Sequence, residues 1–259
     1  MLYLSISRWN IKSEEDKIEG VKHIMMRDKN RTKEYFDEYI EKQIQNFKEF
    51  KELLDDESVL EERLPLLKEM LFEYKLYIIT AKYSRGDSMK EMVSDYNEML
   101  EFWKEICNLD YIKEVYEEGL WFISLGILLG QKESIQEVKK TLEKNKINDW
   151  LFNFLLYYDG SNIDQISGEL LGHKKYQSLK KAICTLDRKQ LIHYLEKEWY
   201  PGFKDFGWYD SHKNTKRGHN LYFGYWCFEA GAIVKLLKWD DSDFKEQQYY
   251  PHDLVHYKE

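Results

Sequence analysis

The scarcity of helix breakers, in a chain full of helical periodicity, constrains the fold more than any other feature. The 259 residues include only three prolines, and glycines are sparse before about residue 160. In residues 33–54, aromatic and aliphatic side chains recur at steps of three and four, the spacing of one helical face. Residues 111–129 become apolar on nearly every side towards their end, which is typical of a helix in the middle of a protein. This pattern predicts an all-α fold.

Periodicity and breakers divide the chain into about ten helices. We predict an irregular helical bundle in two closely packed halves, residues 1–108 and residues 109–259. Residues 201–219, which hold a proline and three glycines, predict a long exposed loop. The expected helices span 33–54, 60–83, 88–107, 111–129, 132–144, 147–158, 163–171, 175–184, 187–199 and 219–238.

The chain carries no obvious membrane or export signal. No run of about 18 uncharged apolar residues occurs, so we expect no membrane-spanning helix. The first ten residues lack the basic and apolar regions of a secretory signal. Their one pattern is a strand-like alternation too short to define a sheet, at Leu2, Leu4 and Ile6. Three widely separated cysteines in apolar contexts predict reduced core residues of a cytoplasmic protein; they are Cys107, Cys184 and Cys227.

The net charge of −8 is unevenly distributed along the chain. Residues 1–160 carry 33 acidic and 24 basic side chains, whereas the remainder is nearly neutral. An acidic surface disfavours direct nucleic-acid binding, which needs basic groups. It favours a basic partner, although acidity can also serve solubility alone.

Three local clusters could carry chemistry, and each has a simpler interpretation. His252, Asp253 and His256 resemble metal ligands, but no third and fourth ligand is visible at short spacing, so we expect no metal and no cofactor. Asp240, Asp241, Ser242 and Asp243 could suggest a cation site, but they precede a possible short helix at 244–248, and Asp241 or Ser242 as its N-cap needs no ion. The residues from His212 to His219 form a small basic loop that also holds Lys213, Lys216 and Arg217; a solvated loop explains it.

Glu229 lies inside an apolar run from Leu221 to Leu237. A buried carboxylate must find a hydrogen-bond partner or change its pKa, which makes Glu229 the best single candidate for a general acid or base. Nearby tyrosine and tryptophan side chains could satisfy it structurally instead. No nucleophile–base pair is visible around it, so the sequence indicates that the protein is not an enzyme.

An acidic stripe is the strongest constellation in the sequence. At 100° per residue, six acids fall within an arc of about 120° on the predicted helix 88–107 and its start, with the apolar side chains opposite. Few lysines interrupt the stripe, which favours a binding surface over a merely solvated face; the solvated face remains the alternative. The stripe comprises Asp87, Glu91, Asp95, Glu98, Glu101 and Glu105, and Glu114, Glu117 and Glu118 continue its sign.

The order of several short motifs resembles the PoNe-immunity (PoNi) family. The N-terminal part holds Met26-Arg27-Asp28 followed by Tyr35-Phe36-Asp37-Glu38-Tyr39-Ile40, and the middle holds residues 121–130 followed by Asp149-Trp150-Leu151. The closing elements are Gly224-Tyr225-Trp226, Glu229-Ala230, Asp240-Asp241-Ser242, Tyr249-Tyr250-Pro251 and Asp253-Leu254-Val255. The residues that we expect to act structurally within this pattern are Trp121, Tyr225, Trp226, Glu229, Asp240, Asp241, Tyr250, Pro251 and Asp253.

The resemblance implies an all-helical cytoplasmic immunity protein that binds a cognate PoNe-type DNase toxin delivered between competing bacteria. It implies inhibition by occlusion of the toxin's basic DNA-binding and active-site surface, and the acidic stripe with its continuation is the expected contact. Two alternatives stay open: a small-molecule or nucleotide hydrolase using Glu229, Asp240, Asp241 and His252, or an unrelated helical adaptor. No oligomeric state follows from the sequence.

Overall fold

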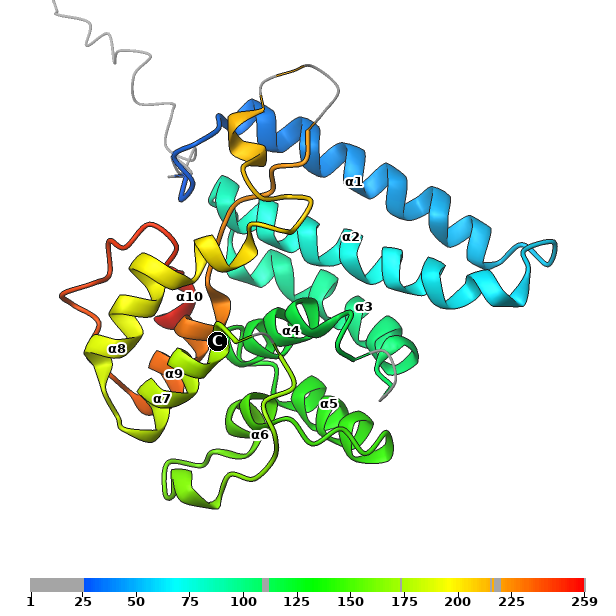
Figure 1. The fold of residues 1–259 in the computed structure, drawn as a ribbon. Helices are drawn as coiled ribbons and strands as arrows, with labels where there is room; N and C mark the ends of the chain where they lie inside the picture. The colour runs from blue at the N-terminus through cyan, green and yellow to red at the C-terminus, as the bar shows by residue number, and fades with distance from the viewer. Residues whose placement is uncertain (1–25, 109–111, 173, 215, 217–219, 259) are drawn as a thin grey trace, which may run out of the picture.

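The computed structural model describes residues 26–108, 112–172, 174–214, 216 and 220–258. These residues form ten α-helices and no strand, which confirms the predicted all-α fold (Figure 1). The strand-like alternation at Leu2, Leu4 and Ile6 lies outside the described residues. Among the helices of the described residues, none combines the length and apolar character needed to cross a membrane.

The ten α-helices differ widely in length, from twenty-two residues to a single turn. Short 3₁₀ turns lie at Glu61–Arg63, Ile163–Gln165, Tyr200–Phe203 and Ser211–Lys213, and a π-helical turn at Tyr194–Glu198 continues α8. The helices are α1 (Lys33–Leu54), α2 (Leu64–Arg85), α3 (Met89–Ile106), α4 (Tyr116–Leu128), α5 (Lys132–Lys144), α6 (Trp150–Tyr157), α7 (Tyr176–Cys184), α8 (Arg188–His193), α9 (Phe228–Leu237) and α10 (His252–Val255).

The N-terminal half consists of α1, α2 and α3. The two long helices α1 and α2 run side by side, and α3 packs on α2 (Figure 1). The hydroxyl of Thr32 caps α1 by accepting a hydrogen bond from the amide of Tyr35. Gly86 ends α2 in the left-handed conformation (φ 101°), which glycine adopts without steric cost and which turns the chain into α3.

The C-terminal half is built around α4. This helix packs on α9, α5 and α6, and it also touches α2 and α3, so that it joins the two halves. Its near-uniform apolar character is explained by this central position. Gly126 permits the closest approach to α3, because a Cβ atom there would stand 2.1 Å from the hydroxyl oxygen of Tyr96.

Three of the predicted helices differ from the structure in extent, and the one expected at 111–129 begins only at Tyr116. Residues 163–171 form only the turn Ile163–Gln165, because the backbone of Glu169 bonds to Asn148 and Trp150 instead, and Gly168 has a φ of 116°. The helix expected at 219–238 begins only at Phe228. Before it, Gly224 has a φ of 103°, which no helix accommodates, and its missing Cβ leaves room for the side chain of Ser84.

The prediction of an exposed loop over 201–219 is right only in part for the described residues, which form turns with exposed side chains such as Lys204 and Asp205 but also bury several aromatic rings. Phe203 and Trp208 are buried, and Tyr200 stacks on Tyr209 with ring centroids 4.6 Å apart. Aromatic side chains therefore anchor this segment to the core. The cysteine prediction holds for Cys107 and Cys227, which are free and buried, but Cys184 is exposed at the end of α7.

Candidate functional site

Neighbouring helices supply lysines that face the acidic stripe of α3. Lys75 of α2 donates to Asp95 at 2.9 Å and lies 2.7 Å from a carboxylate oxygen of Glu98. Lys82 donates to Asp95 at 2.6 Å, and Lys51 of α1 donates to Glu98 at 3.1 Å. Burial acts to raise the pKa of Glu98, but Lys75 and Lys51 outweigh it and the pKa is lowered.

Further ion pairs extend along the stripe in both directions. Lys68 of α2 donates to Glu105 at 3.0 Å, and Lys104 donates to Glu101 at 2.9 Å. At the other end, Arg85 forms two hydrogen bonds with Asp87, at 2.8 and 2.5 Å.

These ion pairs show that part of the stripe is not an open acidic surface. Asp87 is only 5% exposed, and the side chain of Asp95 is 13% exposed, so neither offers a free carboxylate. The positive charges that pair with the stripe lie mainly on α2. There Lys68, Lys75 and Lys82 follow one another at intervals of seven residues and so share one face. That spacing was visible in the sequence as a lysine face, and the packing of α2 against α3 joins this face to the stripe in an interhelical ion-pair ladder.

Part of the predicted acidic set remains at the surface. Glu101 and Glu105 keep 71% and 58% of their side chains exposed despite their lysine partners, and Glu91 and Glu114 are also exposed. Exposed ion pairs of this kind contribute little to stability, about 0–1 kcal/mol each. These four carboxylates can therefore meet a partner without disturbing the fold.

Glu117 is buried within the fold. It is 3% exposed and lies 3.3 Å from the ammonium group of Lys175, whose pKa is lowered by burial. The same ammonium group lies 3.3 Å from the ring centre of Phe203. This pair links α4 to the start of α7 and does not form part of an open surface.

Glu118 of α4 lines a groove between α1, α2 and the residues 206–208 and 220–223. The groove has a volume of about 540 Å³, and Glu73, Tyr77 and Leu221 also line it. One carboxylate oxygen of Glu118 is buried without a hydrogen-bond partner. Burial raises the pKa of Glu118 to about 8 and that of Glu73 to about 7, with neighbouring carboxylates adding to both shifts. Two carboxyl groups that hold protons near neutral pH therefore lie at the wall of this groove.

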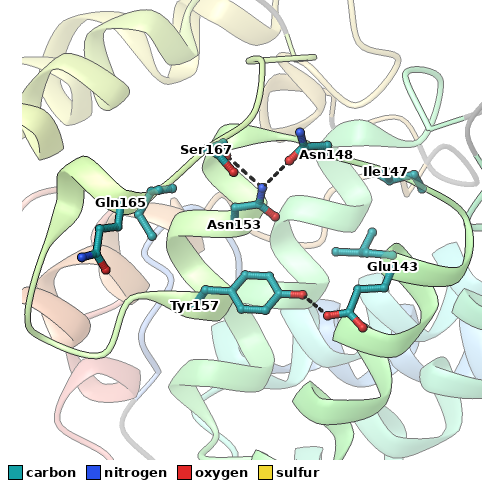
Figure 2. Close-up of a pocket in the computed structure, with 9 residues that line it drawn as sticks. Glu143, Ile147, Asn148, Asn153, Tyr157, Gln165 and Ser167 are labelled. Carbon is teal, nitrogen blue, oxygen red and sulfur yellow. Dashed lines mark hydrogen bonds between the residues drawn. The ribbon is translucent and has the colours of Figure 1, made fainter.

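A second pocket lies against α6 and the segment 163–168. It has a volume of about 310 Å³ (Figure 2). Its polar groups bond to one another: the amide of Asn153 donates to Asn148 and to the backbone of Ser167, and Tyr157 donates to Glu143 (Figure 2). This mutual pairing explains the polar lining without a ligand.

The aromatic residues of the C-terminal motifs join distant segments. The indole nitrogen of Trp226 donates to the hydroxyl of Ser84 on α2 at 2.8 Å, and the Trp226 ring meets Tyr83 edge-on at 4.8 Å. Tyr225 donates to the backbone of Trp208 at 3.0 Å. Trp121 of α4 packs on Trp208 with ring centroids 5.9 Å apart.

Glu229 is fully buried, as its position in an apolar run predicts. Tyr194 and Trp199 donate to one of its carboxylate oxygens, at 3.1 and 2.9 Å. Burial raises the pKa of Glu229, and burial likewise raises the pKa of the nearby Cys227 thiol. These bonds give Glu229 the structural role that aromatic donors nearby had suggested.

Asp241 does not cap a helix, because residues 242–246 form turns only. Its carboxylate accepts a hydrogen bond from Tyr250 at 2.7 Å and lies 2.9 Å from the Nε2 atom of His256. Burial opposes these contacts, but together they lower the pKa of Asp241. Asp240, by contrast, is exposed, and its carboxylate accepts from the backbone amide of Ser242.

The basic loop is only partly described, since Arg217 and His219 lie outside the described residues. Lys213 donates to Asp210 at 2.8 Å. His212 is half-buried, with its Nδ1 atom 3.3 Å from the hydroxyl of Tyr225, and burial lowers its pKa. Lys216 is exposed.

The structure thus defines a helical bundle with an aromatic core and a charged ladder on α3. Two family models cover most of the chain: "PoNe immunity protein (PoNi), N-terminal" matches residues 27–140, and "PoNe immunity proteins (PoNi), C-terminal" matches residues 147–254. The chain belongs to the PoNe immunity protein family. The boundary predicted between residues 108 and 109 stays a prediction.

A solved structure with a similar fold is described as "The Crystal Structure of Protein PA2201 from Pseudomonas aeruginosa". It is 19% identical, the match covers 83% of this chain and 87% of that one, and the TM-score is 0.57. At this identity the similarity shows the fold alone. Among curated proteins, no similar sequence is found.

Proposed function

We propose that this protein is a cytoplasmic immunity protein that binds a cognate PoNe-type DNase toxin and blocks it. The observation that carries the proposal is the match of both PoNe immunity family models, over residues 27–140 and 147–254. An immunity protein acts by binding, so it needs a stable surface and no catalytic group of its own.

The proposed mechanism is occlusion of the toxin's basic surface. A nuclease must attract the phosphate backbone of DNA, so its cleft carries positive charge that an acidic protein can match. The net charge of −8 is consistent with such a partner. Within the stripe and its continuation, the exposed acids Glu91, Glu101, Glu105 and Glu114 are the proposed contacts.

The hydrolase alternative receives less support from the arrangement of its residues. Glu229 bonds to Tyr194 and Trp199 in the core, whereas Asp241 and His252 belong to a separate cluster near the C-terminus. A reaction that used all of them would need these groups to meet at one substrate.

The test is co-expression of this protein with the proposed cognate PoNe-type DNase toxin, followed by measurement of cell survival. The variant carries Glu91→Lys, Glu101→Lys and Glu105→Lys, which avoids the buried pairs of Asp95. We expect protection to fall sharply, while the free energy of unfolding changes little because each position is exposed.

The matched control reverses three exposed acids of the C-terminal half, Glu169→Lys, Asp205→Lys and Glu246→Lys. It changes the net charge by the same amount, so general charge effects on binding appear in both variants. Full protection by the first variant would exclude the α3 surface as the contact. Failure of the unmodified protein to protect would argue against the function itself.

A further inference from the structure

Three side chains that the sequence keeps apart come together near the C-terminus. Asp241 lies in the loop after α9, His252 begins α10, and His256 follows its last residue. One ligand atom from each of the three lies within 4.8 Å of the other two. The absence of a third and a fourth ligand at short spacing was the reason to expect no metal here, and Asp241 supplies a third.

The donor set has the composition of a known class of metal site. Two imidazoles and one carboxylate are ligands of divalent transition metals, and zinc binds such sets with a fourth position left to water or another donor. The histidines are four residues apart, so that the short helix presents both on one face. Their rings are 4.5 Å apart between centroids.

The surroundings of Asp241 match those of a ligating carboxylate. It is 5% exposed, and the hydroxyl of Tyr250 donates to it at 2.7 Å. Carboxylate ligands in metal sites are commonly held by such outer hydrogen bonds, which orient them and tune their affinity. Both oxygens of Asp241 lie 2.9–3.0 Å from Nε2 of His256.

Two sets of contacts hold the ligand-bearing segments in place. Arg188 of α8 donates to the backbone oxygen of Asp240 and, at 2.8 Å, to the carboxylate of Asp243, which fixes the loop on both sides of Asp241. Arg27 donates to Asp253 at 2.6 Å, and Lys235 of α9 donates to the backbone oxygen of Tyr257 at 3.0 Å. The ligands are thus arranged before any ion arrives, which lowers the cost of binding one.

We propose that Asp241, His252 and His256 form a binding site for one zinc ion or a similar divalent transition metal. The ion would join the loop after α9 to α10 and so fasten the C-terminal segment of the chain. This inference concerns the chain alone and does not depend on a toxin partner. The opposing interpretation is a carboxylate–imidazole hydrogen bond with a second histidine nearby.

The experiment uses the full chain, freed of metal by a chelator that is then removed by dialysis. Zinc is added in a calorimetric titration, and bound metal is measured by elemental analysis after desalting. The variant is His252→Gln, which leaves the bond between His256 and Asp241 in place. The control is His193→Gln, at an exposed histidine on α8 whose imidazole lies 3.3 Å from Glu198.

We expect about one zinc per chain for the parent and the control, and binding at least ten-fold weaker for His252→Gln, since even outer-shell changes cost 10–100-fold. Zinc should also raise the melting temperature of the parent more than that of His252→Gln. Equal affinities in all three proteins would mean an adventitious ion only and would overturn the proposal. No bound zinc in the folded parent would overturn it as well.

Discussion

The acidic stripe on α3 and the C-terminal segment 224–257 differ in how their polar groups are paired. On α3, carboxylates lie at the edge of the core and are neutralised by lysines of α1 and α2. In the C-terminal segment, polar atoms are buried with neutral partners instead: the indole nitrogen of Trp226 donates to Ser84, and the carboxylate of Glu229 accepts from Tyr194 and Trp199. Asp95 and Glu98 can each lose one lysine and keep another, whereas the indole nitrogen of Trp226 has no second acceptor among the described residues to replace Ser84.

The largest effect on the free energy of unfolding is expected from a substitution of a buried ring that joins two segments. Trp226→Ala should lower the free energy of unfolding by about 3–5 kcal/mol, because it removes a packed indole and leaves Ser84 without its donor. Chemical denaturation of the purified variant measures this loss.

Trp226→Phe serves as the control for that change, since it keeps a buried aromatic ring while removing the hydrogen bond to Ser84 and only part of the indole's volume. Its loss should be distinctly smaller. If Trp226→Ala unfolds like the parent but no longer binds toxin, Trp226 is a contact residue, and the structural role assigned to it is wrong.

Replacement of Glu118, which lines the groove, should have the next largest effect on stability, and this effect depends on pH. The pKa of Glu118 rises from an ordinary 4.5 to about 8 in the folded protein, so the folded state holds a proton that the unfolded state releases. Its contribution is therefore fully present below about pH 4.5 and is lost as pH rises towards 8. Glu118→Gln should remove this dependence and stabilise the protein at pH 8 relative to the parent.

Melting temperatures of both proteins between pH 5 and pH 8.5 measure this difference. Glu105→Gln is the matched control, because it changes an exposed carboxylate for which no such burial exists. Parallel curves for the parent and Glu118→Gln would show that the Glu118 carboxyl ionises normally.

Removal of single lysines from the ion-pair ladder should lower the free energy of unfolding less, and by amounts that differ along the ladder. Lys75→Met removes the ammonium group shared by Asp95 and Glu98, but Lys82 and Lys51 still pair with these acids. We expect a loss of about 1–3 kcal/mol, below the 3–5 kcal/mol typical of a buried pair with no substitute partner.

Lys68→Met provides the comparison, since its partner Glu105 is 58% exposed, and the loss should be about 0–1 kcal/mol. Urea denaturation of both variants gives the two values. Equal losses would contradict the distinction between the buried and exposed parts of the ladder.

The fold could be predicted well wherever the sequence of a helix contains all the information that sets its bounds. The predicted spans 33–54 and 132–144 coincide with α1 and α5, because their apolar faces and polar flanks are complete within each segment. The prediction failed where the conformation depends on a distant partner. Gly224 takes its positive φ beside Ser84, about 140 residues away, and no local pattern reports that contact.

The candidate site shows the same limit. The acids of the stripe were identified correctly as one face of a helix, but their partners lie on other helices. Lys68, Lys75 and Lys82 were readable as a face of α2, yet only the packing of α2 against α3 shows that the two faces meet. The cluster of Asp241 with His252 and His256 likewise depends on how residues 242–250 bring the chain back.

We propose that this protein inhibits a DNase by binding it. The most direct test is a titration of the nuclease activity with the purified protein. The purified PoNe-type DNase proposed as its partner cleaves a defined DNA fragment while increasing amounts of this protein are added. We expect cleavage to fall in proportion to the protein added and to stop near one molecule per nuclease. Undiminished cleavage in the presence of excess folded protein would contradict the claim.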